Sequence, residues 1–511
     1  MKIRVLLISL FLILIGNQVN AQKKLNKKLK ELDKYYAKSL KDWKVPGMAV
    51  AIVHDNKIIF EKGYGVKNIN TEEKVDENTL FQIASNTKSF TTAALSILVS
   101  ENKIKWDDPI QKYIPWFQLY NTYVSGNISI RDALSHRSGL VTFSGDLIWY
   151  GSKYNRKEVI RRARFLQPKF PFRTRFGYSN ILYLTAGEII PEVTGISWDE
   201  YIKTKIFAPL EMSRSITSEK DLLNKENVAT PHHMIEGKPV VTHYINWDNI
   251  APAGSIISSV HDISNWLIMH LNKGKYKGKE ILKAEQIYEM QSPNTPIYLS
   301  EKSSKMFPSQ HFKAYALGWQ VFDYEGKKIV THNGGADGMI SQTVLIPELK
   351  IGFVILTNAS SGLYYPNLYK TLDVILDKKN APDWSKLILE SKKAKSKLLT
   401  QKVDQEKLPM CLEQKDYIGV YGGDIYGNAK VSFIKKGNQN ELYLELLPTP
   451  MFKGILKHIS LNTFEIKFPE APGLPSGTVN FLVNEKGIPY KIIIDIPNPD
   501  FNFKELELIR K

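Results

Sequence analysis

The chain has 511 residues, of which 43% are hydrophobic and 24% are charged. This composition is that of a folded globular protein and excludes extended disorder, and the length favours two or three domains. Because the sequence contains one cysteine, an intrachain disulfide is excluded. The formal net charge of +17 favours attraction to an anionic cell-envelope surface, whereas no zinc finger, basic zipper or RNP-like strand indicates a nucleic-acid partner.

The first 21 residues have the pattern of a secretory signal peptide. Lys2 and Arg4 precede an apolar run from Val5 to Ile15, and Ala21 ends a small-residue stretch typical of a cleavage site. The apolar run is shorter than the ~20 residues that a membrane span needs. We therefore expect an exported protein, periplasmic or secreted, that is cleaved after Ala21 and has no transmembrane span in the mature chain. An uncleaved anchor is the alternative.

Three elements are predicted before residue 100. Residues 23–43 carry apolar side chains at helical spacing on a basic background, which predicts an amphipathic helix that ends before Pro46. Residues 47–65 have the pattern of two strands joined at the Asp55-Asn56 turn. Residues 87–100 are rich in Ala, Leu and Ile at helical spacing, which predicts a buried helix.

The next part of the chain changes from helix back to strand. Residues 105–245 are mainly helix and loop, and residues 259–271 have the pattern of another helix. From about residue 315, three strand-like stretches follow, and a helix over 368–376 closes the region. Strands thus bracket a helical middle, which predicts an α+β domain in which one sheet gathers both ends.

A lysine-rich stretch with few aromatic residues, in which leucines at 387, 389, 398 and 399 allow some helix, separates this domain from a region of different composition. From residue 411 onward, about eight short apolar or alternating segments are separated by Gly, Pro and Asn, which predicts a small β-barrel or sandwich. We therefore divide the chain into a signal peptide (1–21), an α+β domain (22–376), a charged linker (377–410) and a β-barrel domain (411–511).

The first candidate for chemistry is Ser85 with Lys88, in the stretch FQIASNTKSFTT. Three residues apart on a helix places both side chains on one face, with Cβ atoms about 5–6 Å apart. A buried lysine can activate a serine hydroxyl as a nucleophile, and the start of a helix favours a developing oxyanion. The alternative is an ordinary polar helix start with a solvated lysine.

The second candidate is Tyr178-Ser179-Asn180. A tyrosine near an ammonium group can accept the serine proton and pass it to a leaving group. The amide of Asn180 can hold both Lys88 and a substrate carbonyl. With 25 tyrosines in the chain, a chance match is the alternative.

The third candidate is His332-Asn333-Gly334-Gly335, at the end of a predicted strand. Glycines there let a substrate lie against the strand edge, backbone to backbone. The backbone N–H of Gly335 can pair with that of Ser85 to form an oxyanion hole. A purely structural histidine is the alternative for His332.

In this order and spacing the three motifs resemble those of the serine β-lactamase-related family. The family includes class C β-lactamases, penicillin-binding proteins, D-alanyl-D-alanine carboxypeptidases, D-aminopeptidases and family VIII esterases. The resemblance covers roughly residues 30–376. It implies a β-lactamase/transpeptidase-like domain, with an antiparallel sheet flanked by helices and an added helical region. The region after residue 411 resembles the lipocalin-like barrel that some members carry.

The resemblance also implies a role for each matching residue. Ser85 is the acylated nucleophile, and Lys88 shares its proton and keeps Tyr178 partly ionised. Tyr178 is the general base and then the general acid. Asn180 orients the lysine and the substrate, and the backbone N–H groups of Ser85 and Gly335 bind the oxyanion. No metal and no other cofactor is implied.

His332 stands where β-lactamases usually have the lysine of Lys-Thr-Gly, and Asn333 replaces the small hydroxyl residue. A histidine is mostly neutral near pH 7, so recognition of a substrate carboxylate is weakened. The resemblance therefore implies a serine hydrolase of D-amino-acid peptides, small amides or esters, with weak or no β-lactamase activity. Its partner is a small-molecule, peptide or cell-wall substrate. The alternative is a catalytically silent cell-wall or ligand-binding protein on the same scaffold.

Overall fold

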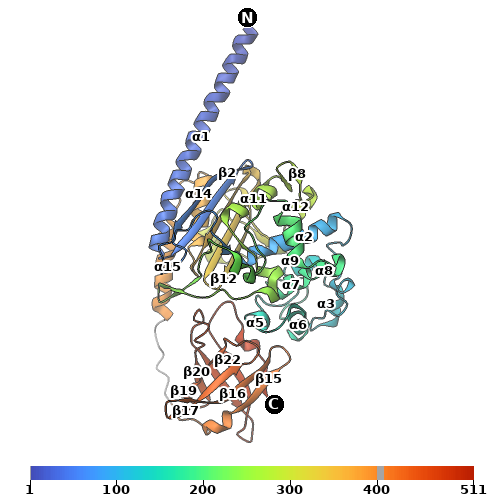
Figure 1. Ribbon diagram of the computed structural model, residues 1–511, viewed down its shortest axis with the longest axis vertical. Helices are drawn as coiled ribbons and strands as arrows, with labels where there is room; N and C mark the ends of the chain where they lie inside the picture. Colours follow the sequence, from blue (N-terminus) through green and yellow to red (C-terminus); the bar gives the residue numbers. More distant parts are fainter. Residues whose placement is uncertain (1, 400–407) are drawn as a thin grey trace.

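The computed structural model describes residues 2–399 and 408–511, with side chains for 22–394 and 408–511. A long N-terminal helix, a mixed α/β domain and a C-terminal barrel follow one another along the longest axis of the molecule (Figure 1). The α+β domain and the all-β domain expected from the sequence are thus both confirmed.

The centre of the first domain is an antiparallel sheet of eight strands in the order β2-β1-β14-β13-β12-β11-β10-β9. The strands are β1 (Gly47–His54), β2 (Lys57–Gly65), β9 (Thr295–Pro296), β10 (Lys313–Tyr315), β11 (Gln320–Tyr324), β12 (Lys327–Ala336), β13 (Met339–Ile346) and β14 (Ile351–Thr357). The N-terminal hairpin pairs with the last strand, with Met48 opposite Thr357. One sheet therefore joins both ends of the domain, as its sequence pattern predicts.

Most helices of the first domain lie between the hairpin and the later strands. Those before residue 200 are α1 (Lys2–Asp42), α2 (Thr87–Ser100), α3 (Thr122–Asn127), α4 (Ile130–Leu134), α5 (Asp146–Trp149), α6 (Arg156–Arg162), α7 (Asn180–Gly187), α8 (Ile189–Thr194) and α9 (Trp198–Ile202). The later ones are α10 (Ala251–Gly254), α11 (Val260–Leu271), α12 (Ala284–Met290), α13 (Glu301–Met306), α14 (Tyr364–Ile375) and α15 (Trp384–Leu399). The predicted buried helix over 87–100 is confirmed as α2.

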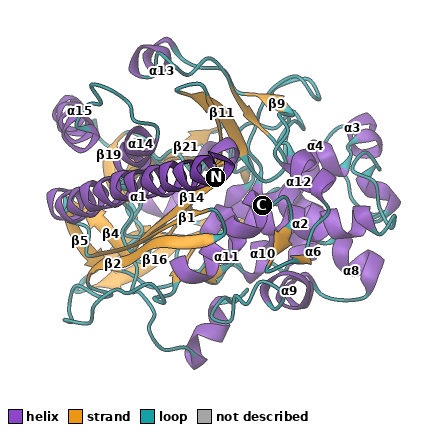
Figure 2. Cartoon of the chain, turned by 90° about the horizontal axis from the view of Figure 1, so that it is seen from above, coloured by secondary structure: helices purple, strands orange, loops and turns teal. Residues whose placement is uncertain are grey.

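Helices cover both faces of the sheet, because alternate residues of a strand point to opposite sides. Ala49 and Ala51 of β1 belong to the hydrophobic core that includes α2 and α11. Val50 and Ile52 belong to a second core, shared with α1 and α14. Figure 2 shows α1 and α14 on one side of the sheet and α11 and α2 on the other. The active-site elements described below lie on the α2 side.

The second domain is a nearly closed antiparallel barrel, with strand order β18-β17-β16-β15-β23-β22-β21-β20-β19. The strands are β15 (Gly419–Gly423), β16 (Gly427–Lys436), β17 (Gln439–Leu446), β18 (Lys453–Ile455), β19 (Lys457–Ser460), β20 (Thr463–Ile466), β21 (Gly477–Val483), β22 (Pro489–Asp495) and β23 (Leu508–Arg510). Only Leu456 separates β18 from β19, which lie at the two ends of this order. Nine strands form where about eight are expected, because one predicted strand is divided there.

The structure corrects the linker predicted over residues 377–410. Sixteen of those residues form α15, which packs against the first domain. The indole N–H of Trp384 donates to Asp373 at 2.6 Å, and that of Trp43 donates to Ser385 at 2.9 Å. On α15, Lys386 and Lys393 are exposed while Trp384 and Ser385 are buried, so overall composition does not reveal the packed face of this helix.

The predicted signal peptide falls on residues whose side chains lie outside the described part of the chain, and its cleavage stays a prediction. The backbone of those residues continues α1, which is 41 residues long. Within the described residues, no helix is both long enough and apolar enough to cross a membrane. Further along α1, Leu32 and Tyr36 are buried against the sheet, and the Tyr36 hydroxyl bonds to that of Thr371 at 2.6 Å.

If α15 is part of the first domain, Trp384→Ala will destabilise that domain. Trp384 is 2% exposed, so its removal leaves a cavity and should lower the free energy of unfolding by about 3–5 kcal/mol. Urea unfolding followed by tryptophan fluorescence measures this. Leu387→Ala is the matched control, because Leu387 lies on the same helix but is 42% exposed. Equal effects of the two substitutions would contradict the packing of α15.

Candidate active site

The candidate nucleophile lies in a rigid turn between the sheet and α2. The 3₁₀ turn η1 (Ala84–Asn86) begins with Ala84 at a φ of 47°, a left-handed conformation that costs a non-glycine residue about 1 kcal/mol or more. Asn86 holds the turn in place, since its amide donates to the Ser341 hydroxyl at 2.7 Å. Its amide oxygen also accepts a hydrogen bond from Thr343 on β13. Ser85 is partly exposed at this turn while its neighbours are buried.

Lys88 is completely buried and its Nζ lies among three oxygen atoms. It is 3.1 Å from Ser85 Oγ, 2.7 Å from Asn180 Oδ1 and 2.8 Å from the carbonyl oxygen of Ala253. The latter two oxygens can only accept hydrogen bonds. A neutral amine has two hydrogens, so both are used by these acceptors and the lone pair faces the serine hydroxyl. This geometry suits removal of the Ser85 proton.

Burial favours this neutral form of Lys88. Desolvation lowers the pKa of Lys88 from 10.5 to about 7, and the charge of Asp146 opposes the shift. A substantial fraction of the amine is therefore neutral near pH 7. In that state Lys88 can accept a proton, whereas an ordinary lysine is fully protonated.

Asp146 is a residue of the site that sequence reasoning missed. It accepts a hydrogen bond from Asn180 Nδ2 at 2.7 Å and another from the Trp149 indole at 2.9 Å. Because a carboxylate accepts the amide N–H, Asn180 must present its oxygen to Lys88. Burial raises the pKa of Asp146 to about 7, against the effect of these hydrogen bonds. The only signal in the sequence is a single acidic residue in the apolar stretch GDLIWYG.

Tyr178 lies next to this lysine, but in a different role from the predicted one. Lys88 Nζ is 4.7 Å from the centroid of the Tyr178 ring, and the three oxygens that it bonds do not include the tyrosine hydroxyl. Burial raises the pKa of Tyr178 well above its usual value, although the Ser85 hydroxyl opposes this shift. Burial therefore opposes the expected partial ionisation of Tyr178, which stays a prediction. A protonated tyrosine can act as the general acid, and Lys88 is the better placed base.

His136 packs against the Tyr178-Ser179-Asn180 segment and accepts a hydrogen bond from it. Its ring lies 4.2 Å from the Tyr178 ring, and its Nδ1 accepts the backbone N–H of Ser179 at 3.0 Å. Its φ of 58° lies in the left-handed region. Burial lowers the pKa of His136 well below its usual value, so the ring is neutral. The histidine thus holds the acid and the amide of the second motif in one orientation.

His332 of the third motif is buried and faces Tyr315 rather than open space. Its Nδ1 lies 2.6 Å from the Asn333 carbonyl, and its Nε2 lies 2.8 Å from the Tyr315 hydroxyl. A carbonyl only accepts, so Nδ1 carries the proton and Nε2 accepts from the tyrosine. Burial lowers the pKa of His332 to about 3. Contrary to the expectation of substrate binding, both ring nitrogens are already engaged, so His332 positions the strand and offers substrate no charge.

Gly334 lets the end of β12 approach the nucleophile turn closely. A Cβ atom at this position would lie 2.1 Å from the Ile83 carbonyl oxygen and 2.8 Å from the Ser85 backbone nitrogen. Only glycine avoids that overlap. The next residue, Gly335, is exposed at the strand edge. The two backbone N–H groups expected to form the oxyanion hole thus belong to elements that are in direct contact.

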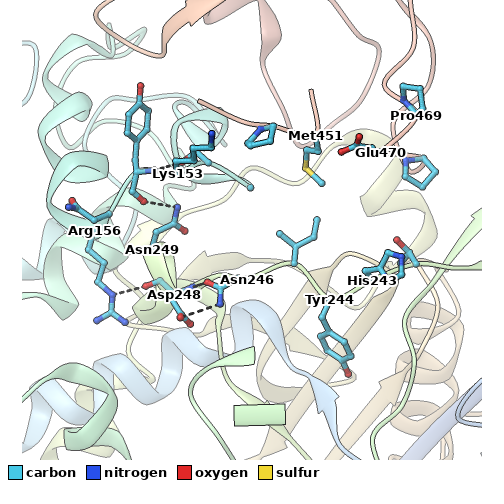
Figure 3. A pocket seen from close by; sticks show the side chains of 18 of the residues that line it. Lys153, Arg156, His243, Tyr244, Asn246, Asp248, Asn249, Met451, Pro469 and Glu470 are labelled. Atoms are coloured by element: carbon cyan, nitrogen blue, oxygen red, sulfur yellow. Dashed lines mark hydrogen bonds between the residues drawn. The ribbon is translucent and has the colours of Figure 1, made fainter. Parts of the chain in front are cut away.

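A cavity of about 920 Å³ opens between the two domains (Figure 3). One side is formed by residues of segments 151–156 and 241–249, which belong to the first domain. The barrel side is formed by Pro450, Met451, Pro469, Glu470 and Pro472. Along 243–246, no described residue forms a hydrogen bond with the backbone N–H or carbonyl groups. Because this segment lines the cavity, the wall there includes backbone groups that have no partner among the described residues.

Comparison with known proteins agrees with this geometry. The family model described as Beta-lactamase matches residues 32–371, and a domain of unknown function (DUF3471) matches 405–510. The unguisins hydrolase ungD of Aspergillus violaceofuscus is 30% identical over 371 residues, which cover 68% of this chain and 65% of that protein. Protein flp of Staphylococcus aureus is 28% identical over 354 residues, covering 68% and 66%. The chain thus spans about two thirds of the length of these relatives.

A solved structure shows the same fold. The octameric penicillin-binding protein homologue from Pyrococcus abyssi aligns with a TM-score of 0.62 at 22% identity, over 94% of this chain and 100% of that one. The Beta-lactamase model covers most of the chain, and the fold is that of a penicillin-binding protein. The protein therefore belongs to the β-lactamase family of serine hydrolases.

Proposed function

We propose that the protein is an exported hydrolase that cleaves D-amino-acid peptides, small amides or esters through an acyl-enzyme on Ser85. One observation carries this proposal: Lys88 Nζ lies 3.1 Å from the Ser85 hydroxyl oxygen and within hydrogen-bond distance of two atoms that can only accept, Asn180 Oδ1 and the Ala253 carbonyl oxygen. A serine with a positioned base at this distance is an activated nucleophile.

The chemistry follows from these positions. Lys88 accepts the hydroxyl proton as Ser85 Oγ attacks the carbonyl carbon, and the N–H groups of Ser85 and Gly335 stabilise the oxyanion. Tyr178 gives its proton to the leaving amine or alcohol as the carbonyl re-forms, and the proton held by Lys88 restores it. A water molecule then hydrolyses the ester bond, with the same groups accepting and returning its protons.

The neutral third motif favours amides and esters over β-lactams. Both ring nitrogens of His332 are bonded to Tyr315 and Asn333 and the ring is neutral, so this residue itself offers no charge to a substrate carboxylate. A fixed charge at this position would supply a charge-assisted hydrogen bond. The name of the relative unguisins hydrolase supports a hydrolytic activity, without naming this chain's substrate.

The interdomain cavity is suited to the part of the substrate remote from the scissile bond. The segment that lines it leads within four residues from Asn249 to Ala253, whose carbonyl accepts from Lys88. The backbone groups at 243–246 that have no partner among the described residues can pair with an extended peptide, as strand addition does in other proteins. Peptide substrates are thus favoured over small amides.

Export rests on the leader pattern of residues 1–21, and the basic charge favours an anionic cell envelope. We also infer that the barrel is lipocalin-like. The alternative function is a catalytically silent binding protein that uses the interdomain cavity alone. That alternative leaves the buried Lys88 without a purpose, because a buried amine costs stability.

Labelling separates catalysis from silent binding. A fluorophosphonate probe should modify wild type on Ser85, and Ser85→Ala should reduce labelling to background. Ser100→Ala, at the end of the same helix, is the control and should label like wild type. In a substrate panel, D-amino-acid amides and p-nitrophenyl esters should turn over faster than a chromogenic cephalosporin. Unlabelled wild type, or equal labelling of Ser85→Ala, would favour the silent binding protein.

The pH dependence tests the identity of the base. With a p-nitrophenyl ester, kcat/KM should rise with pH through an apparent pKa of about 7, because only neutral Lys88 can accept the serine proton. Lys88→Arg should lower kcat/KM by at least about 10²-fold, since a guanidinium stays protonated.

Asp146→Asn identifies which group titrates. The charge of Asp146 raises the pKa of Lys88, so Asp146→Asn should still show a rising limb in the kcat/KM profile. That limb should lie at lower pH than in wild type. Loss of the limb in Asp146→Asn would assign it to the aspartate instead. A wild-type rate that falls as pH rises through 7 would exclude a neutral lysine base.

A further inference from the structure

The C-terminal barrel contacts the first domain directly beside the catalytic residues. Glu505 lies in the 3₁₀ turn η9 (Phe503–Glu505) of the barrel. Its Oε1 accepts a hydrogen bond from the Ser144 hydroxyl at 2.6 Å, and its Oε2 accepts the backbone N–H of Gly145 at 2.9 Å. One carboxylate thus holds two donors of the turn that precedes α5.

That turn has an unusual conformation, and its own domain supports it by hydrogen bonds from the Phe143 N–H to the Tyr178 carbonyl (2.8 Å) and from the Ser144 N–H to the Val141 carbonyl (3.1 Å). Phe143 has a φ of 64° and Gly145 a φ of 80°, so left-handed residues stand on both sides of Ser144. Gly145 is the N-cap residue of α5 and has no side chain that could cap the helix. Glu505 accepts the Gly145 N–H and so stabilises, from another domain, a conformation that the local sequence does not favour.

The residue after this turn is Asp146, which positions the Lys88 amine indirectly, through Asn180. Asp146 orients Asn180 through the 2.7 Å hydrogen bond from Nδ2, and Asn180 accepts from Lys88 at 2.7 Å. Glu505 is therefore connected to Lys88 through a continuous series of short contacts. A small shift of the turn would move the Asp146 carboxylate and the Asn180 amide, which together orient the lone pair of Lys88 toward Ser85.

The same barrel segment is also linked, through Tyr150, to the end of strand β12. Phe501 packs on Tyr150 with ring centroids 4.4 Å apart. The Tyr150 hydroxyl donates to Asp337 at 2.5 Å, and Asp337 follows Gly335 by two residues at the end of β12. The barrel segment is thus linked both to the turn that precedes α5 and to the end of β12.

We propose that Glu505 is a positioning residue of the active site, and that the barrel is part of the catalytic structure rather than a separate binding module. Glu505 holds the turn at 143–145 so that Asp146 and Asn180 keep the Lys88 lone pair on Ser85. The inference rests on the proposed function, because it needs turnover at Ser85.

The charged and titratable groups around the amine predict what loss of this support does. The charges of Lys88 and Glu505 both act on Asp146. The rings of Tyr178 and Tyr183 lie next to the Lys88 amine. The charge of Lys88 also acts on His136 and His332. The low pKa of Lys88 depends on burial. A loosened turn admits water, so the pKa of Lys88 should move up toward its ordinary value.

The test compares Glu505→Gln and Glu505→Ala with Glu507→Gln in the full-length protein. Glu507 lies two residues further on in the same barrel and its side chain is exposed, so it controls for lost charge. Glu505→Ala should lower kcat for a p-nitrophenyl ester about tenfold or more with KM changed by less than about twofold, because Glu505 acts on the Lys88 base and does not line the interdomain cavity. Glu505→Gln keeps one acceptor oxygen and should be intermediate.

The pH profile and a double substitution separate positioning from a merely structural role. In Glu505→Ala the rising limb of kcat/KM should move to higher pH, and Glu507→Gln should match wild type. The double variant Ser144→Ala/Glu505→Ala should lose less activity than the two single losses, expressed as free energies, add up to. The reason is that the two residues share one contact. An unshifted pH profile with lowered thermal stability alone, or strictly additive effects, would overturn the inference.

The outcome also distinguishes this inference from the proposed function. If wild type is neither labelled by a fluorophosphonate nor active on the ester, the proposed function fails. If wild type is labelled and active and both Glu505 variants match it, only the inference about Glu505 fails.

Discussion

The structure depends on how one amine is buried. Among the described residues, no carboxylate bonds to Lys88, and an isolated ammonium in such a place would cost several kcal/mol. The cost is avoided when the amine is neutral, and two fixed acceptors then determine where its lone pair points. Three features determine where Lys88 Nζ lies relative to the Ser85 hydroxyl: the strained turn at Ala84, the amide of Asn180 and the carbonyl of Ala253.

The second constraint is that the supports of this amine come from distant parts of the chain. Asn180 starts α7, Ala253 belongs to α10, and Asp146 starts α5. The barrel adds Glu505, which is 361 residues from its partner Ser144. A catalytic group held from so many elements is rigid, and its orientation depends on both domains being folded and docked.

Local pattern predicted much of this molecule and failed where contacts are long-range. The α+β domain, the helix over 87–100 and the three motifs follow from periodicity, spacing and resemblance, because these are properties of neighbouring residues. Asp146 and Glu505 carry no such pattern, since their roles arise from tertiary contact. Burial raises the pKa of Tyr178, and this burial cannot be read from Tyr-x-Asn.

The same reason explains the other corrections. A histidine in His332-Asn333-Gly334 gives no sign that its ring nitrogens face Tyr315 and its own strand. The lysines of 377–410 suggested a solvated linker, although Trp384 anchors part of that stretch to the first domain. For His332 and for the stretch 377–410, the sequence shows the residue types but does not show which distant residues they contact.

The protonation state of Lys88 tests the account most directly. Lysine labelled with ¹⁵N at Nζ, with Lys88→Arg used to assign the signal, allows this amine to be titrated by NMR in the intact protein. The account predicts a midpoint of about 7 for the pKa of Lys88. A midpoint near the ordinary value of 10.5 would show a protonated amine at neutral pH and would contradict its role as the base.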